Sequence, residues 1–180
     1  MNRKNRVLAA LDMAVLPLLM TSVPAHGAQA AALPPGGPAK LVNRNSSKCA
    51  DVEGWSKDDG GNVPQWSCRL DNDSNQKWTF RRTADGYRNV VNQNSGKRLD
   101  VQGSSYNDGA HLHQRTCPDY GSQKWELQYT TTEYFKLVSA YSGKCMDVEG
   151  PSRDDGAQIH QWTCRNKDGN SQQWRFFTAT

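Results

Sequence analysis

A threefold internal repeat constrains this chain more than any other feature of its sequence. Two motifs recur in one register: an Asp-Val pair that begins at Asp51, Asp100 and Asp147, and a Gln-x-Trp motif that ends at Trp78, Trp125 and Trp174. The repeated aspartates are 49 and 47 residues apart. A period of this length is typical of folds built from several copies of one supersecondary unit. We therefore expect three repeats, over about 40–82, 86–128 and 134–177.

Each repeat is predicted to contain short β-strands separated by turns. In the third repeat, apolar or alternating runs predict strands over 134–138, 145–148, 157–163 and 173–176. A turn is predicted at 154–156, because Asp and Gly tolerate a positive φ. No repeat shows a sustained apolar period of 3.6 residues, which argues against helices. About four strands in each of three repeats predict an all-β fold of about twelve strands.

Two closed all-β folds could be built from four-stranded units. A β-propeller typically closes with at least four blades, and this chain has three repeats. We therefore predict a β-trefoil, in which three pseudo-threefold repeats form a barrel capped by hairpins. Trp78, Trp125 and Trp174 would fill equivalent core positions, and burying each ring would stabilise the fold by roughly 3 kcal/mol.

The cysteines indicate disulfides and an oxidising compartment. Four of the five cysteines form two pairs with the same separation of 19 residues, Cys49 with Cys68 and Cys145 with Cys164. Equal spacing predicts two equivalent disulfides, each worth on the order of 3 kcal/mol through the unfolded state. Cys117 is left over, because Arg98 stands where the other two repeats have their first cysteine.

The N-terminus is typical of a secretory signal peptide, which we assign to residues 1–30. Three basic residues precede an apolar stretch over 7–20, and an Ala-x-Ala pattern follows at 28–30. A membrane anchor is the alternative, but the apolar run is shorter than the about 20 residues that span a bilayer. Residues 31–39, rich in Pro and Gly, are then a linker to a domain over 40–180. We expect the protein to be secreted.

Charge and ligand chemistry argue against several partners. The formal net charge is +4, and no Lys/Arg stripe is present, so the electrostatic footprint of a nucleic-acid-binding protein is missing. We expect no nucleic-acid or membrane partner. His111 and His113 would share one side of a strand, but no third ligand accompanies them, and the cysteines form no C-x₂-C pair. We therefore predict no metal ion and no cofactor.

The Gln-x-Trp motifs, the Asp-Val pairs and the paired cysteines together resemble the ricin B-type lectin family. The similarity is closest to carbohydrate-binding modules of that type in secreted bacterial glycosidases, and it covers about residues 40–180. The resemblance implies a β-trefoil with one potential sugar site in each repeat. Known members mostly bind galactose-type sugars or xylan, so we expect one of these carbohydrates as the partner of a multivalent monomer.

The resemblance assigns a sugar site to the first repeat. A carboxylate accepts strong hydrogen bonds from sugar hydroxyls, and a flat ring covers the apolar C–H face of the sugar. Asp51 would be the carboxylate, Trp66 the ring 15 residues later, and Asn75 and Gln76 the accompanying amides. Trp66 could instead belong to the core. The second repeat has Arg115 at this position, which favours a surface platform.

The third repeat matches this pattern and the second departs from it. In the third repeat the site would consist of Asp147, His160, Trp162 and Gln172, with Ser171 in place of the usual Asn. In the second repeat Asp100 and Gln123 persist, but Arg115 and Ser122 replace the platform and the Asn; Tyr106, His113 or Tyr120 could compensate. The three glutamines have an alternative role, which is to orient the aspartates and not to touch the sugar.

Catalysis is not expected. A glycosidase needs two carboxyl groups held across one glycosidic bond, whereas the acidic residues Glu53 and Glu149 follow the repeated Asp-Val pairs in step with the fold. Groups that repeat with the fold favour multivalent binding. Two alternatives from other classes remain: a β-trefoil inhibitor or protein-interaction module that binds no sugar, and a small enzyme with one unique polar cluster.

Overall fold

The computed structural model describes residues 34–116, 120–166 and 169–178. The expected signal peptide over 1–30 and Cys117, the cysteine left over in the sequence, lie outside these described residues. No helix in the described part of the chain is long and apolar enough to cross a membrane.

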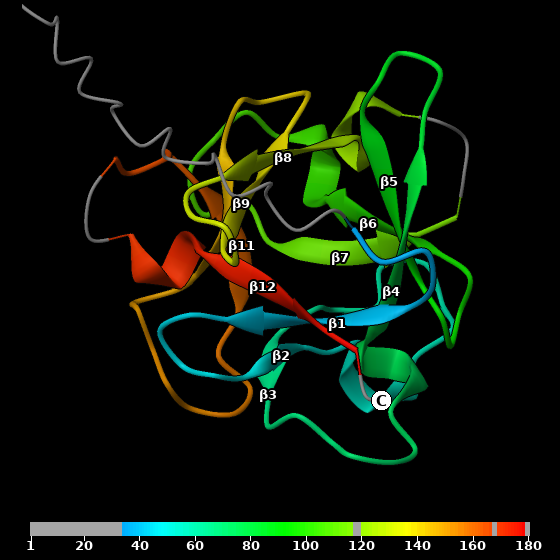
Figure 1. The fold of residues 1–180 in the computed structure, drawn as a ribbon. Coiled ribbons are helices and arrows are strands. Elements are labelled where there is room, and N and C mark those ends of the chain that lie inside the picture. Colours follow the sequence, from blue (N-terminus) through cyan, green and yellow to red (C-terminus); the bar gives the residue numbers. More distant parts are fainter. Residues whose placement is uncertain (1–33, 117–119, 167–168, 179–180) are drawn as a thin grey trace, which may run out of the picture.

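The described residues form twelve β-strands, four in each repeat (Figure 1). The first repeat contains β1 (Ala39–Asn43), β2 (Cys49–Ala50), β3 (Gln65–Trp66) and β4 (Lys77–Arg82). The second contains β5 (Arg88–Asn92), β6 (Arg98–Val101), β7 (Leu112–Arg115) and β8 (Trp125–Tyr129). The third contains β9 (Phe135–Ser139), β10 (Cys145–Val148), β11 (Ile159–Trp162) and β12 (Trp174–Phe177). The expected all-β fold with four strands in each repeat is confirmed.

Five single-turn 3₁₀ helices were not predicted. They are η1 (Glu53–Trp55), η2 (Ser74–Gln76), η3 (Gln102–Ser104), η4 (Gly121–Gln123) and η5 (Asn170–Gln172). A three-residue turn is too short to produce a helical hydrophobic period. β1 also begins one residue earlier than the domain start expected from the sequence, because Ala39 already packs in the core.

Six strands close into a barrel and six form its cap. The barrel strands pair in the closed order β1–β4–β5–β8–β9–β12 and back to β1. The other strands form three hairpins, β2–β3, β6–β7 and β10–β11. Each hairpin is joined to one barrel strand, β1, β5 or β9. This closed barrel with three equivalent hairpins is the β-trefoil predicted from the repeats.

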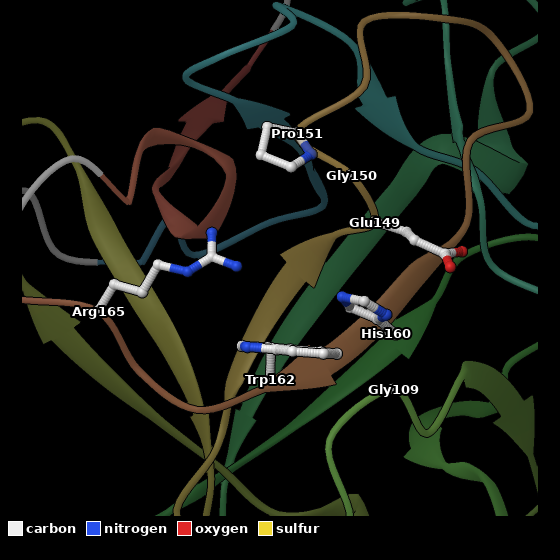
Figure 2. Close-up of a pocket in the computed structure, with 7 residues that line it drawn as sticks. All are labelled: Gly109, Glu149, Gly150, Pro151, His160, Trp162 and Arg165. Atoms are coloured by element: carbon white, nitrogen blue, oxygen red, sulfur yellow. The ribbon is translucent and has the colours of Figure 1, made fainter.

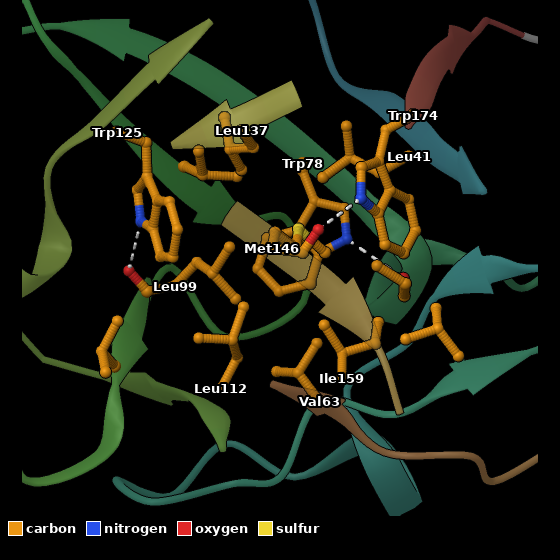
Figure 3. Close-up of a cluster of buried hydrophobic side chains, with 14 of the residues drawn as sticks. Leu41, Val63, Trp78, Leu99, Leu112, Trp125, Leu137, Met146, Ile159 and Trp174 are labelled. Carbon is orange, nitrogen blue, oxygen red and sulfur yellow. Dashed lines mark hydrogen bonds between the residues drawn. The ribbon is translucent and has the colours of Figure 1, made fainter. Parts of the chain in front are cut away.

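The tryptophans of the Gln-x-Trp motifs hold the core together (Figure 3). Trp78, Trp125 and Trp174 are fully buried, as predicted. Each indole Nε1 donates a 3.1 Å hydrogen bond to the backbone carbonyl of the residue just before a repeated aspartate, at Ala50, Leu99 and Met146. The buried ring therefore does more than fill space, because it anchors the hairpin strand that leads to each aspartate.

Three buried glutamines lock the repeats to one another. The Nε2 group of each glutamine donates to two backbone carbonyls of another repeat: Gln65 to Ser152 and Asp154, Gln114 to Ser56 and Asp58, and Gln161 to Ser105 and Asn107. The first repeat thereby binds the third, the second binds the first, and the third binds the second. This closed circle of contacts fixes the three hairpins relative to one another.

Both predicted disulfides are present. Cys49 bonds Cys68, and Cys145 bonds Cys164. Each bridge joins the beginning of a cap hairpin to the segment that follows the hairpin.

Replacing Trp125 by alanine tests whether the buried indole is as important as its contacts indicate. We expect Trp125→Ala to lower the free energy of unfolding by about 3–5 kcal/mol, because a fully buried ring and its hydrogen bond are both lost. Urea unfolding with the disulfides intact measures this change. Leu70→Ala is the control, since Leu70 is 87% exposed and should change stability by less than about 0.5 kcal/mol. Equal effects of the two substitutions would contradict the assignment.

Candidate functional site

The candidate sugar sites lie on the hairpins that cap the barrel. In the third hairpin, Asp147 of β10 pairs with His160 of β11, and Trp162 lies two residues farther along β11. Directly paired residues, and residues two apart on one strand, share a face of the sheet. Trp66 and Trp162 are 39% and 37% exposed. These two indoles are therefore available to a ligand, in contrast to the buried indoles of the Gln-x-Trp motifs.

The glutamine of each Gln-x-Trp motif orients an aspartate from the inside. Nε2 of the glutamine donates to Oδ2 of the aspartate, at 2.7 Å for Gln76 and Asp51, 3.1 Å for Gln172 and Asp147, and 3.5 Å for Gln123 and Asp100. The three glutamines are fully buried. Their placement matches the orienting role considered for them from the sequence.

Asn75 also lies behind the carboxylate of the first repeat. Its Nδ2 donates to Oδ1 of Asp51 at 2.8 Å and to the carbonyl of Val52 at 3.0 Å. The side chain is fully buried, so Asn75 positions the carboxylate instead of facing the surface.

The first repeat has a hollow of about 210 Å³ in front of this aspartate. It is lined by Asp51, Glu53, Gly54, Trp55, Trp66 and Arg69, and we call it the first-repeat hollow. Nη1 of Arg69 donates to Oδ2 of Asp51 at 2.8 Å, and the guanidinium lies 5.7 Å from the ring of Trp55. Carboxylate, guanidinium and two indoles therefore meet in one concave surface.

The third repeat has a larger hollow of about 380 Å³ at the equivalent place (Figure 2). It is lined by Gly109, Glu149, Gly150, Pro151, His160, Trp162 and Arg165, and we call it the third-repeat hollow. The rings of His160 and Trp162 stack with centroids 5.3 Å apart. Figure 2 shows the side chain of Arg165 extending into the hollow from the side opposite Glu149. Nη2 of Arg165 lies 3.4 Å from Oδ2 of Asp147, which is buried beneath.

The two carboxyl groups differ in acidity. Burial raises the pKa of Asp51 above its ordinary value, and the hydrogen bond from Gln76 and the charge of Arg69 offset this effect only in part. Burial also disfavours the charged form of Asp147, but contacts with His160 and Gln172 and the charge of Arg165 outweigh it, so the pKa of Asp147 is lowered.

The second repeat keeps the aspartate, a histidine paired with it and the orienting glutamine, but not the platform indole. Asp100 is buried, and Nε2 of His113 lies 3.4 Å from its Oδ2. No described residue donates a hydrogen bond to Oδ1 of Asp100, and the same is true of Oδ1 of Asp147 in the third repeat. Arg115 stands at the platform position and lies over the ring of Tyr120 at 5.8 Å. Tyr106 stacks on Tyr141, and both Tyr106 and Tyr120 have exposed rings.

The analysis of the sequence missed three charged or aromatic side chains of the hollows, those of Trp55, Arg69 and Arg165. The two arginines directly follow Cys68 and Cys164, so the repeat period already places them at equivalent positions. That coincidence is the signal that could have identified them. Trp55 has no such signal, because its counterparts are Ser104 and Pro151.

Comparison with known families agrees with the fold and the repeated motifs. Residues 86–180 match the ricin-type β-trefoil lectin domain, and residues 32–115 match its domain-like relative. The chain belongs to the ricin-type β-trefoil lectin family, and it is a carbohydrate-binding module of the lectin type. Among curated proteins, none matches this chain.

Several solved structures are similar to this chain. ThreeFoil, a designed threefold-symmetric protein, is 40% identical with a TM-score of 0.74, and the match covers 79% of this chain and 99% of ThreeFoil. An exo-β-1,3-galactanase from Clostridium thermocellum is 33% identical with a TM-score of 0.74, and the match covers 82% of this chain but 31% of the galactanase. A Macrolepiota procera ricin B-like lectin in complex with lactose is 19% identical with a TM-score of 0.66 over 81% of this chain and 97% of the lectin, and shares the fold.

The opposite pKa shifts of Asp51 and Asp147 predict opposite effects of pH on stability. A lowered pKa stabilises the folded protein above the ordinary value of 3.8, and this stabilisation is lost as the pH falls. A raised pKa stabilises the folded protein at low pH, since the folded state binds the proton more tightly than the unfolded state, and this stabilisation is lost as the pH rises. Compared with wild type, Asp147→Asn should therefore become more destabilising as the pH rises from about 3 to 7. Asp51→Asn should become less destabilising over the same range. Urea unfolding across this range measures both, and parallel curves for the two variants would contradict the assignment.

Proposed function

We propose that this protein is secreted and binds galactose-type sugars or a xylan-like polysaccharide through the first-repeat and third-repeat hollows together. One observation carries the proposal: the two hollows share four elements that come from equivalent positions of their repeats. Each has an aspartate beneath it, a Glu-Gly pair on one side, an exposed indole on another and an arginine at its edge.

The chemistry of each hollow suits a neutral sugar ring. The exposed indole offers a flat apolar surface to the C–H face of the sugar, and the gain grows with the area removed from water. The aspartate accepts hydrogen bonds from hydroxyl groups once the arginine moves aside, and the guanidinium keeps further N–H donors for sugar oxygens. Such shallow sites bind individually with micromolar to millimolar Kd, on the order of −4 to −8 kcal/mol.

Galactose-type sugars are supported by what similar structures are named for. One is an exo-β-1,3-galactanase and another was solved with lactose. Secretion is supported by the signal peptide expected over 1–30 and by the two disulfides, since disulfides persist in oxidising compartments.

The platform indoles provide a direct test of the sites. The double variant Trp66→Ala/Trp162→Ala should weaken binding to immobilised galactan or xylan by roughly tenfold at each site, about 1.4 kcal/mol per site, because the apolar contact surface is gone from both hollows. A pull-down competed by free lactose or xylose measures the loss, and circular dichroism verifies the fold.

Arg115→Ala is the matched control, since it changes the same position in the second repeat. It should leave binding intact. A double tryptophan variant that still holds polysaccharide would contradict the site assignment. A wild-type protein that binds no glycan would favour a protein-interaction module.

Cooperation of the two hollows predicts a difference between polymer and small sugar. Two sites on one rigid body raise the apparent affinity for a polymer by effective concentration, up to about 10²-fold or more. Trp162→Ala alone should therefore weaken polymer binding far more than twofold. Calorimetry of the same variant with an oligosaccharide should show one binding site in place of two, and the affinity of the remaining site should be unchanged. A merely twofold loss on polymer would show that the sites act independently.

A further inference from the structure

Each disulfide joins the two segments that build one sugar site. In the first repeat, Cys49 lies two residues before Asp51, and Cys68 lies between Trp66 and Arg69. The bridge thus connects the strand of the carboxylate to the segment that carries both the platform and the guanidinium. The third repeat has the same arrangement around its own bridge.

The second repeat shows that the fold does not need this bridge. It contains a single cysteine, so it cannot form the equivalent disulfide. Arg98 nevertheless pairs with Arg115 in the same register in which Cys49 pairs with Trp66 and Cys145 with Trp162. Strand pairing in the cap is therefore independent of the disulfide.

The disulfide occurs only in the repeats that have the site residues, whereas the residues that close the fold occur in all three repeats. The second repeat lacks the first cysteine, the platform indole and the arginine together, with Arg98, Arg115 and Pro118 in their places. It keeps a hydrogen bond that joins it to another repeat: the backbone N–H of Thr116 donates to Oδ1 of Asp59 in the first repeat at 2.7 Å. The equivalent bonds in the other repeats join Ser67 to Asp155 and Thr163 to Asp108, both at 2.6 Å.

We propose that each disulfide is a positioning element of the sugar site in its own repeat. The proposal rests on the proposed function of the two hollows. Without the bridge, the backbone of Arg69 would be held by hydrogen bonds alone, from its N–H to Gln76 at 2.9 Å and from Lys40 to its carbonyl. A sugar would then have to order this segment as it binds, which lowers affinity.

The third repeat offers the same dependence. The N–H of Arg165 donates to Gln172 at 2.9 Å, and Lys136 donates to the carbonyl of Arg165. Because the two bridges are separate, removing one should affect the sugar site of that repeat alone.

The test removes one bridge at a time in the full chain and observes each site separately. The variants are Cys49→Ala/Cys68→Ala and Cys145→Ala/Cys164→Ala, chosen because Cys49 and Cys145 are fully buried. Lactose is titrated while NMR follows the indole N–H signals of Trp66 and Trp162, assigned with Trp66→Phe and Trp162→Phe. We expect roughly tenfold weaker lactose binding at the hollow that has lost its bridge, equivalent to one charge-assisted hydrogen bond. Binding at the other hollow should be unchanged.

A stability control separates positioning from general destabilisation. Leu137→Ala removes a fully buried core side chain of the third repeat that does not line the hollow. It should lower the free energy of unfolding while the lactose affinity at Trp162 is unchanged. Wild-type affinity at both hollows in both bridge variants overturns the inference, as does an equal loss in Leu137→Ala. If one of the double alanine variants does not fold, the same two cysteines are replaced by serine instead. Wild-type protein whose indole signals respond to neither lactose nor xylotriose overturns the proposed function itself.

Discussion

The structure depends on the circle of hydrogen bonds made by Gln65, Gln114 and Gln161. Each side chain is fully buried. Its Nε2 donates to two carbonyls of another repeat, and its Oε1 accepts from a serine hydroxyl of its own repeat, at Ser46, Ser95 or Ser142. A buried amide that lost these partners would retain its full desolvation penalty. Each glutamine is therefore stable inside the molecule only when a second repeat is in place, so the three repeats have to fold together.

The chain separates the residues that close the fold from the residues that build the sugar sites. The buried glutamines, their serine partners and the Gln-x-Trp tryptophans occur in all three repeats. The disulfides, the exposed indoles and the arginines of the hollows occur in two. The second repeat could lose its site residues because none of the replaced side chains takes part in joining the three repeats. The three repeats are therefore alike in the core, whereas the features of the proposed sugar sites occur in two of them.

Periodicity explains which parts of the molecule could be predicted from the sequence. Strands such as β10 (Cys145–Val148), the buried Trp174 and the Cys145–Cys164 bridge were predictable, because each recurs at a fixed spacing or is excluded from water. The roles of Asn75 and Arg69 were not. Asn75 turned out to be buried behind the carboxylate, and Arg69 lies in front of it. Which side of Asp51 a polar side chain occupies depends on the conformation of irregular loops, and sequence spacing does not determine it.

Gln123 shows how a change in one of these loops reaches a carboxylate. In the first and third repeats, Oε1 of the orienting glutamine accepts the backbone N–H of Arg69 or Arg165 at 2.9 Å. The second repeat has Pro118 at this position, and proline has no N–H to donate. Oε1 of Gln123 has no hydrogen-bond partner among the described residues, and its Nε2 lies 3.5 Å from Asp100. Gln123 therefore lacks the backbone donor that holds its two counterparts, and it reaches its aspartate over a longer distance than they do.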